Sequence, residues 1–236
     1  MDDQHQSITK HKPLIGITTD LMIRNDRPTA YATQTYAQSV LASGGIPVLL
    51  PPVDVDVHEL LARFDGFILS GGDDPVMEPF GKATHPKVTP VLQARQTFET
   101  ALLKALESQP DIPVLGICLG MQMMAIVSGG ELDQYMPDSC PTHEQHWNQE
   151  HEIRSMDESV LSPGVVLSRH KQAISDPAHY RVLATSPDGV IEAFDDPSRA
   201  FTLGIQWHPE RTKLHELGQL IFDRFVDACR AQRTRA

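Results

Sequence analysis

The stretch that decides the fold is Val114-Leu115-Gly116-Ile117-Cys118-Leu119-Gly120-Met121-Gln122. It joins an apolar run, residues 112–117, to a helix-favouring stretch, residues 121–127. Between them stands a cysteine with a glycine two residues before it and another two residues after it. This order predicts a strand, a tight turn and a helix, with the central side chain projecting from the carboxyl edge of a parallel sheet.

Cys118 is the side chain that this turn presents. The unpaired N–H groups and the dipole at a helix N-terminus favour a thiolate over a thiol. Glycine at positions 116 and 120 meets the crowding of such a turn. The pattern therefore indicates a nucleophile. The alternative is a buried structural cysteine, because a lone cysteine needs a base before it can be assigned a catalytic role.

The composition places the chain among globular proteins of one large domain. Its 236 residues contain only three scattered cysteines, Cys118, Cys140 and Cys229, which favours a reducing compartment and predicts a cytoplasmic location. The formal net charge of −11 argues against a nucleic-acid partner. No apolar stretch approaches the roughly 18 residues of a membrane span, so we expect no membrane association.

The predicted organisation is a disordered tail over residues 1–12 and a single domain over residues 13–236. The tail carries charged residues and lacks an apolar core. In the first half of the domain, apolar strands alternate with amphipathic helices. This alternation predicts an α/β fold with a mostly parallel central sheet and helices on both faces. The expected strands are 14–18, 46–50, 66–69 and 112–117, and the expected helices are 31–43, 57–63, 91–106 and 121–127.

The second half of the domain has a different character. Short β-like runs predict antiparallel strands that extend the sheet or form a flap beside it, and a helix over 212–229 closes the chain. The first expected strand, 14–18, ends in a polar segment over 19–29 that contains Pro28. The β-like runs are 153–156, 165–168, 182–185, 190–194 and 201–207.

Two further segments are expected at the edge that carries Cys118. Gly71 and Gly72 follow the strand 66–69 directly, where a glycine turn can aim N–H groups at an anionic oxygen; the alternative is a plain turn. The polar loop 75–89 is long enough to act as a lid. Near the end of the chain, His208 and Glu210 flank a proline that holds the backbone extended, so both side chains can face one site. This pair supplies Cys118 with a base and a group that orients the base.

Taken together, these pieces resemble the class I glutamine amidotransferase family, and within it the γ-glutamyl hydrolase branch (peptidase C26) that includes γ-glutamyl-γ-aminobutyrate hydrolases. The resemblance runs from Gly16 to Glu210 and implies a flavodoxin-like class I glutamine amidotransferase fold with a small antiparallel extension. Besides the turn around Cys118 and the His208-Pro209-Glu210 end, it rests on Gly45-Ile46-Pro47-Val48, Ser70-Gly71-Gly72-Asp73, Phe80-Gly81, Arg95 with Glu99, Gly129-Gly130-Glu131-Leu132, Ser168-x-His170-x-Gln172 and Asp188-Gly189-x-Ile191-Glu192-Ala193.

The resemblance also implies an activity. Cys118 attacks a γ-glutamyl amide and forms a γ-glutamyl thioester, His208 transfers the protons, and Glu210 orients His208. Glutamate and an amine are released, and the partner is a small γ-glutamyl substrate. The alternative is a glutaminase subunit that supplies ammonia to a separate synthase. The implied oxyanion hole is the backbone of Gly71 or Gly72 and of Leu119, and the implied substrate contacts are Gln122, Ser168 and His170. We expect no cofactor, and a homodimer.

Two positions depart from the pattern of this branch. Leu119 stands where arginine is usual, and Leu167 stands where asparagine is expected before Ser168. These changes leave the triad intact but leave the identity of the amine open.

A group of histidines, His143, His146 and His151, with Glu144 and Glu150 between them, offers a competing interpretation as a zinc site. The spacing is not that of a common structural zinc site, and the resembled family carries histidines here with no metal. We therefore expect a polar flap and no metal ion.

Overall fold

The computed structural model describes residues 12–233. All but the last residue of the predicted tail, 1–12, lies outside the described residues. The fold is built on one mixed sheet of eleven strands. Five neighbouring strands at one end of it run parallel, in the order β4 (Ile46–Leu50), β1 (Leu14–Thr18), β5 (Gly66–Leu69), β6 (Val114–Ile117) and β13 (Thr202–Ile205).

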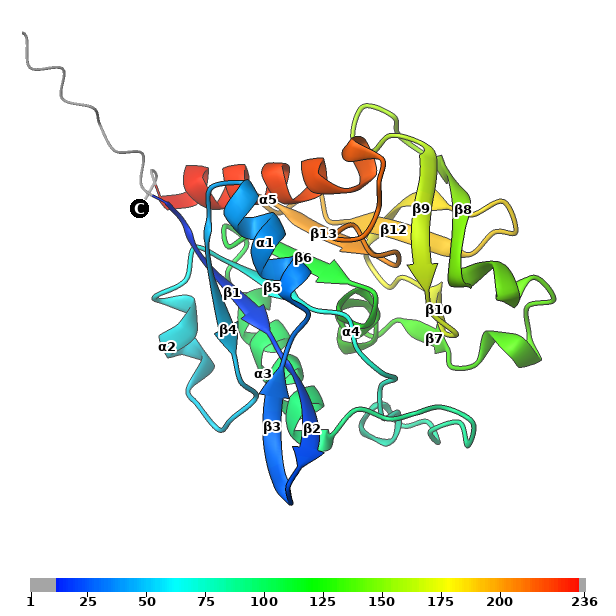
Figure 1. Cartoon of the computed structure of the whole chain (residues 1–236), viewed down its shortest axis with the longest axis horizontal. Coiled ribbons are helices and arrows are strands. Elements are labelled where there is room, and N and C mark those ends of the chain that lie inside the picture. The colour runs from blue at the N-terminus through cyan, green and yellow to red at the C-terminus, as the bar shows by residue number, and fades with distance from the viewer. Residues whose placement is uncertain (1–11, 234–236) are drawn as a thin grey trace, which may run out of the picture.

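The remaining strands of this sheet form the predicted antiparallel extension, which lies beyond β13 at the end of the molecule opposite β4 (Figure 1). Strands β12, β11, β8 and β9 follow β13 in that order, and β10 pairs with β12 and β7. Their bounds are β7 (Glu131–Asp133), β8 (Trp147–Ser155), β9 (Gly164–Arg169), β10 (Ala173–Asp176), β11 (Arg181–Thr185) and β12 (Ile191–Asp195).

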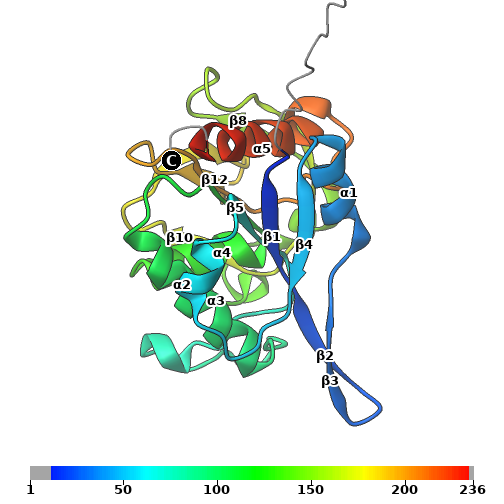
Figure 2. The ribbon, with the colours of Figure 1, turned by 90° about the vertical axis from the view of Figure 1, so that its left-hand side faces the viewer.

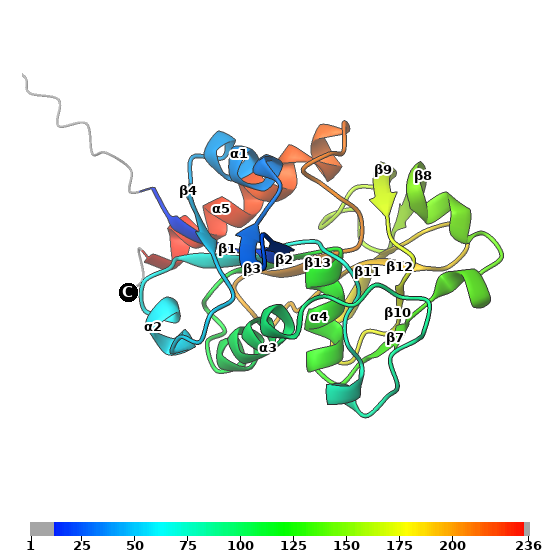
Figure 3. The same cartoon turned by 60° about the horizontal axis from the view of Figure 1, so that its bottom comes forward.

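Helices cover both faces of the parallel part of the sheet, as predicted. Helices α1 (Gln34–Ala42) and α5 (Gln219–Arg233) pack against each other on one face (Figures 1 and 2). On the other face lie α2 (Val57–Leu61), α3 (Gln93–Glu107) and α4 (Leu119–Val127) (Figure 3). Two apolar layers result, one of which includes Phe222 and Phe225 under α5 and the other Leu102 and Met124 under α3 and α4. This packing fixes the carboxyl ends of β5, β6 and β13 close together.

Two strands that were not predicted lie over the polar segment 19–29 and the residues directly after it. The segment forms a projecting hairpin of β2 (Asp20–Arg24) and β3 (Arg27–Tyr31), visible below the sheet in Figure 1. Its two-residue turn, Asn25-Asp26, has positive φ at both residues, the geometry that matches the twist of a hairpin. Pro28 is tolerated because it lies in a strand of a two-stranded ribbon, which is an edge by definition.

Two other expectations for the second half also need correction. Strand β13 pairs in parallel with β6, although it pairs antiparallel with β12, so the final strand completes the parallel part of the sheet. The last helix begins at Gln219 and not at position 212, because residues 212–218 fold into a short loop with the 3-10 turn His215–Leu217. That loop accepts a hydrogen bond from the indole N–H of the buried Trp207 at the Leu217 carbonyl, over 2.9 Å.

Three further 3-10 turns occur in loops near the carboxyl edge of the sheet: Glu78–Phe80, Met136–Asp138 and His143–His146. Among residues 12–233, no helix has the length and apolar character needed to cross a membrane.

Candidate active site

Cys118 occupies the tight turn predicted between β6 and α4. Its backbone has φ 52° and ψ −106°, a conformation that residues with a side chain rarely adopt, and it immediately precedes Leu119, the first residue of the helix. The Cys118 N–H donates to the Ile205 carbonyl of β13 over 2.8 Å, which ties the turn to the neighbouring strand. The turn therefore holds the thiol at the carboxyl edge of the sheet and at a helix N-terminus.

The two glycines beside this turn are required by close packing. A Cβ added to Gly116 would lie 2.4 Å from the sulfur of Met124, and one added to Gly120 would lie 2.1 Å from the carbonyl oxygen of Leu69. The first of these neighbours is the flexible part of a side chain, whereas the second is the backbone of a buried strand.

We expect Gly120→Ala to destabilise the protein strongly because the Leu69 backbone of β5 cannot move without disturbing the sheet. Overpacking of this kind costs about 1–3 kcal/mol or more. Chemical denaturation followed by circular dichroism measures the change in unfolding free energy. Gly81→Ala is the control, because a Cβ there meets nothing within 4 Å, although its φ of 75° carries its own smaller strain. An equal or smaller loss in Gly120→Ala would contradict the packing argument.

His208 and Glu210 lie together as predicted. The Nδ1 atom of His208 is 2.8 Å from Oε1 of Glu210, and the Glu210 side chain is 2% exposed. The His208 N–H donates to the Leu167 carbonyl, and the Thr212 hydroxyl donates to the His208 carbonyl, so the backbone of the histidine is fixed on both sides. The other ring nitrogen of His208, Nε2, is therefore left for the catalytic site.

Cys118 and His208 both lie next to Gly71. A Cβ placed on Gly71 would lie 3.1 Å from Cε1 of His208 and 3.5 Å from Cβ of Cys118. Burial disfavours the imidazolium, but Glu210 and the sulfur of Cys118 outweigh burial and raise the pKa of His208 to about 10. His208 is therefore protonated at neutral pH, the form that can give a proton to a leaving group.

A buried arginine holds the turn that carries the predicted oxyanion glycines. Arg95 of α3 is paired with Asp20 at 3.0 Å and with Glu99 at 3.3 Å, and its guanidinium donates to the carbonyls of Ser70 and Gly71. Because these carbonyls point toward Arg95, the turn is held in one orientation. The arginine also explains the glycine at position 72, where an added Cβ would lie 2.2 Å from Nη1 of Arg95.

The two glycines of this turn differ in the hydrogen bonding and exposure of their backbone. The Gly71 N–H donates to the phenol oxygen of Tyr36 over 3.1 Å, so it is already engaged. Gly72 is exposed and lines the cavity in front of Cys118. Leu119 is the first residue of α4, where a backbone N–H has no partner within the helix. Gly72 and Leu119 are therefore better placed than Gly71 to receive an oxyanion.

A cavity of about 530 Å³ opens in front of these groups. Side chains of both charges line it: carboxylates from residues that include Asp20, Asp73 and Asp74, and cations from Lys87, Arg169, Lys171 and Arg211. Trp147 adds an aromatic surface, with Lys171 Nζ 4.3 Å from the centre of its ring. The cavity suits a small molecule that carries both positive and negative charge.

The predicted lid loop 75–89 and the segment around Tyr135 both contribute to this cavity and contact each other. Lys87 and Thr89 of the loop 75–89 line the cavity, as does Tyr135, which lies shortly after β7. The loop is attached to that segment by a hydrogen bond from the His85 N–H to the Gln134 side chain, 2.7 Å long, and by the stacking of the His85 and Tyr135 rings. The pocket is thus closed on this side by residues of the same chain.

The predicted substrate contacts fall into two groups. Gln122 lines the cavity and donates to the Gln206 side chain over 3.2 Å. His170 lines the cavity as well, but Nδ1 of its ring contacts the Gln172 carbonyl at 2.8 Å and Nε2 faces Glu192. Ser168 does not line the cavity, because its side chain is completely buried and its hydroxyl oxygen is 2.7 Å from His151 Nε2.

Leu119 does not face the cavity either. Its side chain is 1% exposed and packs in the apolar layer that contains Phe98 and Met124. Position 119 therefore contributes only its backbone to the site, and its departure from the usual arginine removes a cation from that position.

Sequence reasoning missed several residues of the site. Tyr36, Arg169, Lys171 and Trp147 line the cavity, yet none belongs to a recognisable chemical motif. Tyr36 is a buried residue of α1, and nothing in the sequence around it indicates a role in the site. Arg169 and Lys171 flank His170, whereas Trp147 begins β8, and only the pairing of β8 with β9, which sets Trp147 opposite Arg169, brings them together.

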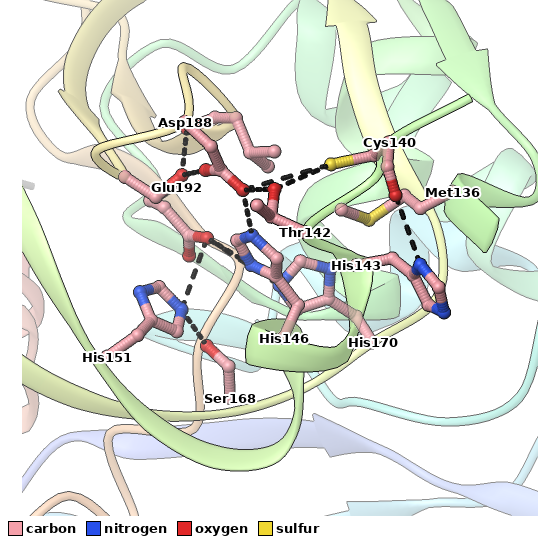
Figure 4. Close-up of polar contacts among 12 residues, drawn as sticks. Met136, Cys140, Thr142, His143, His146, His151, Ser168, His170, Asp188 and Glu192 are labelled. Atoms are coloured by element: carbon pink, nitrogen blue, oxygen red, sulfur yellow. Dashed lines mark hydrogen bonds and ion pairs between the residues drawn. The ribbon is translucent and has the colours of Figure 1, made fainter.

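The prediction of a polar flap is wrong for two of the histidines, His146 and His151. His146 and His151 are buried and lie with His170 and Glu192, which come from distant parts of the sequence (Figure 4). His143 is only half-buried, with Nδ1 near the Cys140 carbonyl, and Glu144 and Glu150 are exposed. The cluster in the structure thus shares only two residues with the group that the sequence suggested.

Comparison with solved structures defines the class of fold. A crystal structure from Thermoplasma acidophilum, named as that of a GMP synthase component, superposes with a TM-score of 0.67 at 20% identity, over 95% of this chain and 98% of that one. The fold is therefore that of the class I glutamine amidotransferases. Comparison at the sequence level is more specific. The peptidase C26 family matches residues 13–210, and the chain belongs to this family.

Two relatives illustrate the range of names within this family. A γ-glutamyl-γ-aminobutyrate hydrolase of Escherichia coli O157:H7 is 31% identical, over 93% of this chain and 94% of the relative. A protein of Mycobacterium tuberculosis named as a glutamine amidotransferase is 32% identical, over 92% of this chain and 75% of the relative. The family and the first of these relatives support an enzyme of the hydrolase class.

Proposed function

We propose that this protein hydrolyses the γ-glutamyl amide of a small amine through a γ-glutamyl thioester on Cys118. The observation that carries the proposal is the convergence of Cys118, His208 and Glu210 on one cavity, with the thiol in a strained turn at a helix N-terminus. A nucleophile, a base and a group that orients the base are the parts that covalent catalysis of acyl transfer requires.

The first half of the reaction is acylation. The Cys118 sulfur attacks the side-chain carbonyl carbon of the γ-glutamyl group, a C–S bond forms, and negative charge develops on the carbonyl oxygen. The N–H groups of Gly72 and Leu119 receive that charge. The C–N bond then breaks as His208 gives its proton to the leaving nitrogen, and the amine departs.

The second half is deacylation. His208 removes a proton from water, the resulting hydroxide attacks the thioester carbonyl, and the C–S bond breaks. Glutamate leaves, the sulfur regains its electron pair, and His208 again holds a proton. Glu210 stabilises the imidazolium in both halves through its contact with Nδ1.

The charged residues that line the cavity favour a γ-glutamyl substrate over an uncharged amide. A γ-glutamyl group carries an α-carboxylate and an α-ammonium, and the walls offer cations such as Arg169 and carboxylates such as Asp73. The loop 75–89 and the segment around Tyr135 line the cavity and belong to this chain, which favours a hydrolase that works without a synthase. The relative named as a γ-glutamyl-γ-aminobutyrate hydrolase points the same way.

A steady-state comparison tests this proposal. The purified protein is assayed without a partner on a panel of γ-glutamyl amides of organic amines and on free glutamine, with glutamate measured by mass spectrometry. We expect a higher kcat/KM for at least one organic amide than for glutamine. Negligible hydrolysis of every amide, with glutaminase activity appearing only when a synthase is added, would favour the alternative of an ammonia-supplying subunit.

The pKa of His208 leads to a prediction about pH. Because Glu210 raises that pKa, the proton for the leaving amine is lost only as pH rises toward about 10, and activity should decline there. Glu210→Gln keeps a group beside the ring but removes the charge. We expect the alkaline limb of kcat/KM to move to lower pH and kcat to fall by roughly 10² to 10⁴.

The measurement is a pH profile of kcat/KM for both proteins on one γ-glutamyl amide. Glu216→Gln, a change of the same kind on the nearby 3-10 turn, is the control and should leave the profile unchanged. An alkaline limb that stays in place in Glu210→Gln would show that Glu210 does not set the protonation of His208.

A further inference from the structure

The buried histidine cluster is built around the carboxylate of Glu192. Oε1 of Glu192 is 3.2 Å from Nδ1 of His146, 3.4 Å from Nε2 of His151 and 3.6 Å from Nε2 of His170. None of these four residues is more than 9% exposed, and Glu192 is completely buried. Three imidazole nitrogens thus point at one carboxylate in a site closed to water (Figure 4).

The outer nitrogen of each imidazole has an oxygen partner of its own. Nε2 of His146 is 3.1 Å from the carboxylate of Asp188. Nδ1 of His151 is 3.0 Å from the Glu152 carbonyl, and Nδ1 of His170 is 2.8 Å from the Gln172 carbonyl. A carbonyl or carboxylate oxygen can only accept, so each outer nitrogen carries the proton. In the neutral imidazoles, the inner nitrogens then present lone pairs.

The centre of the cluster is therefore short of positive charge. Nδ1 of His146, Nε2 of His170 and both carboxylate oxygens of Glu192 are buried and have no hydrogen-bond partner among the described residues. The inner nitrogen of His151 differs, because the Ser168 hydroxyl lies 2.7 Å from it. Lone pairs and a carboxylate that face one another in a dry site repel unless a cation lies between them.

We propose that His146, His151, His170 and Glu192 bind a divalent transition-metal ion, with zinc the preferred occupant. Imidazole and carboxylate are the donors that suit zinc, and four protein ligands with no open position are typical of a structural site. Ligands about 2.0–2.1 Å from zinc in a tetrahedron lie about 3.3 Å apart. The three nitrogen-to-Oε1 distances bracket this value, and all four donor atoms lie within 4.8 Å of one another.

The surroundings of the cluster also fit a metal ion. Histidine ligands of zinc characteristically donate their outer N–H to a carboxylate or a backbone carbonyl, which is the arrangement around all three rings here. Asp188 and Glu192 together carry two negative charges, which a divalent cation balances. Asp188 is itself fixed by the hydroxyls of Thr142 and Ser186.

The ion would join four segments that are distant in the sequence. His146 ends a 3-10 turn, His151 lies in β8, His170 follows β9, and Glu192 lies in β12. The His170 N–H also donates to the His146 carbonyl over 2.9 Å. Because Arg169 and Lys171 beside His170 line the catalytic cavity, the metal would fix one wall of that cavity without touching the reacting atoms. This role is independent of the substrate proposed above.

Protons are the competing source of positive charge. Burial lowers the pKa of His146, but Glu192 and Asp188 outweigh burial and raise it. A metal-free cluster of imidazolium ions around Glu192 is therefore the alternative that an experiment must separate from a metal site.

The test measures metal content and affinity, and it does not depend on activity. The full chain, with any purification tag removed, is stripped with a chelator, incubated with equimolar zinc chloride, desalted and analysed by elemental mass spectrometry. We expect about one zinc per chain. X-ray absorption at the zinc edge should show nitrogen and oxygen ligands and no sulfur. Less than a tenth of an equivalent of zinc on the folded wild-type protein would overturn the proposal.

Variants assign the site to these residues. Glu192→Gln and His146→Gln should lose stoichiometric zinc, and Asp188→Asn, which removes only the support of His146, should weaken zinc binding by roughly 10- to 100-fold in a chelator competition. His143→Gln, on the same 3-10 turn but outside the cluster, is the matched control and should bind as wild type does.

If the ligand variants fail to fold, Asp188→Asn and the wild-type titration still decide the question. Unchanged zinc affinity in Asp188→Asn, or full zinc content in a folded Glu192→Gln, would place the metal elsewhere and contradict the proposal.

Discussion

Replacement of Cys118 by alanine is expected to lower kcat for a γ-glutamyl amide by about 10⁴-fold or more. The nucleophile of a catalytic triad carries most of the rate enhancement, and the residual catalysis comes from binding and the oxyanion hole alone. Steady-state and single-turnover assays with a γ-glutamyl amide measure the loss. Activity within tenfold of wild type would contradict the assignment of Cys118.

The same change should leave the fold intact. Cys118 and alanine are both residues with a Cβ at φ 52°, so the strain of the turn is the same in both proteins. Circular dichroism and the melting temperature check this. Cys140→Ala is the matched control, because Cys140 is half-buried and lies outside the cavity, and it should retain wild-type kcat.

Replacement of His208 by alanine should be nearly as damaging, with a loss of kcat of about 10³- to 10⁵-fold. Without the imidazole, no group protonates the leaving amine or takes a proton from the water that hydrolyses the thioester. The ring is buried against the cavity, so its removal leaves a space beside Cys118. We therefore expect added imidazole to restore part of the activity.

The readout for His208 is the dependence of kcat on imidazole concentration. His179→Ala, which removes a largely exposed histidine far from the cavity, is the control and should show neither the loss nor the rescue. A loss of less than tenfold, or equal stimulation of wild type and His208→Ala by imidazole, would argue against His208 as the base.

Much of the fold could be predicted because its parallel half is encoded locally. Each of the strands β1, β4, β5 and β6 is a short apolar run bounded by glycine, proline or polar residues, and the bounds of each agree with the sequence prediction to within two residues. The turn at Cys118 was predictable for the same reason, since two glycines at fixed spacing are needed for its close approach to Leu69 and Met124.

The second half was harder because its strands are defined by long-range pairing. β7 and β10 are three and four residues long and acquire their identity only by pairing with each other and, for β10, with β12. The direction of β13 is set by β6, more than eighty residues earlier, and no local pattern reveals it.

The candidate site shows the same division. His208 and Glu210 are neighbours in the sequence, so their contact at 2.8 Å follows from an extended chain around Pro209. The histidine cluster could not be predicted, because His170 follows β9 and Glu192 lies in β12, and both meet His146 only after folding. Spacing along the chain suggested His143 instead, which is only half-buried and lies outside the cluster.

The central claim is that Cys118 carries the γ-glutamyl group during turnover. Rapid acid quench of the wild-type protein with a γ-glutamyl amide, followed by proteolysis and mass spectrometry, tests this most directly. We expect one γ-glutamyl group on the peptide that contains Cys118, and none in Cys118→Ala. Turnover without any acylated Cys118 under conditions that trap a thioester, or acylation at Cys140 or Cys229 instead, would contradict it.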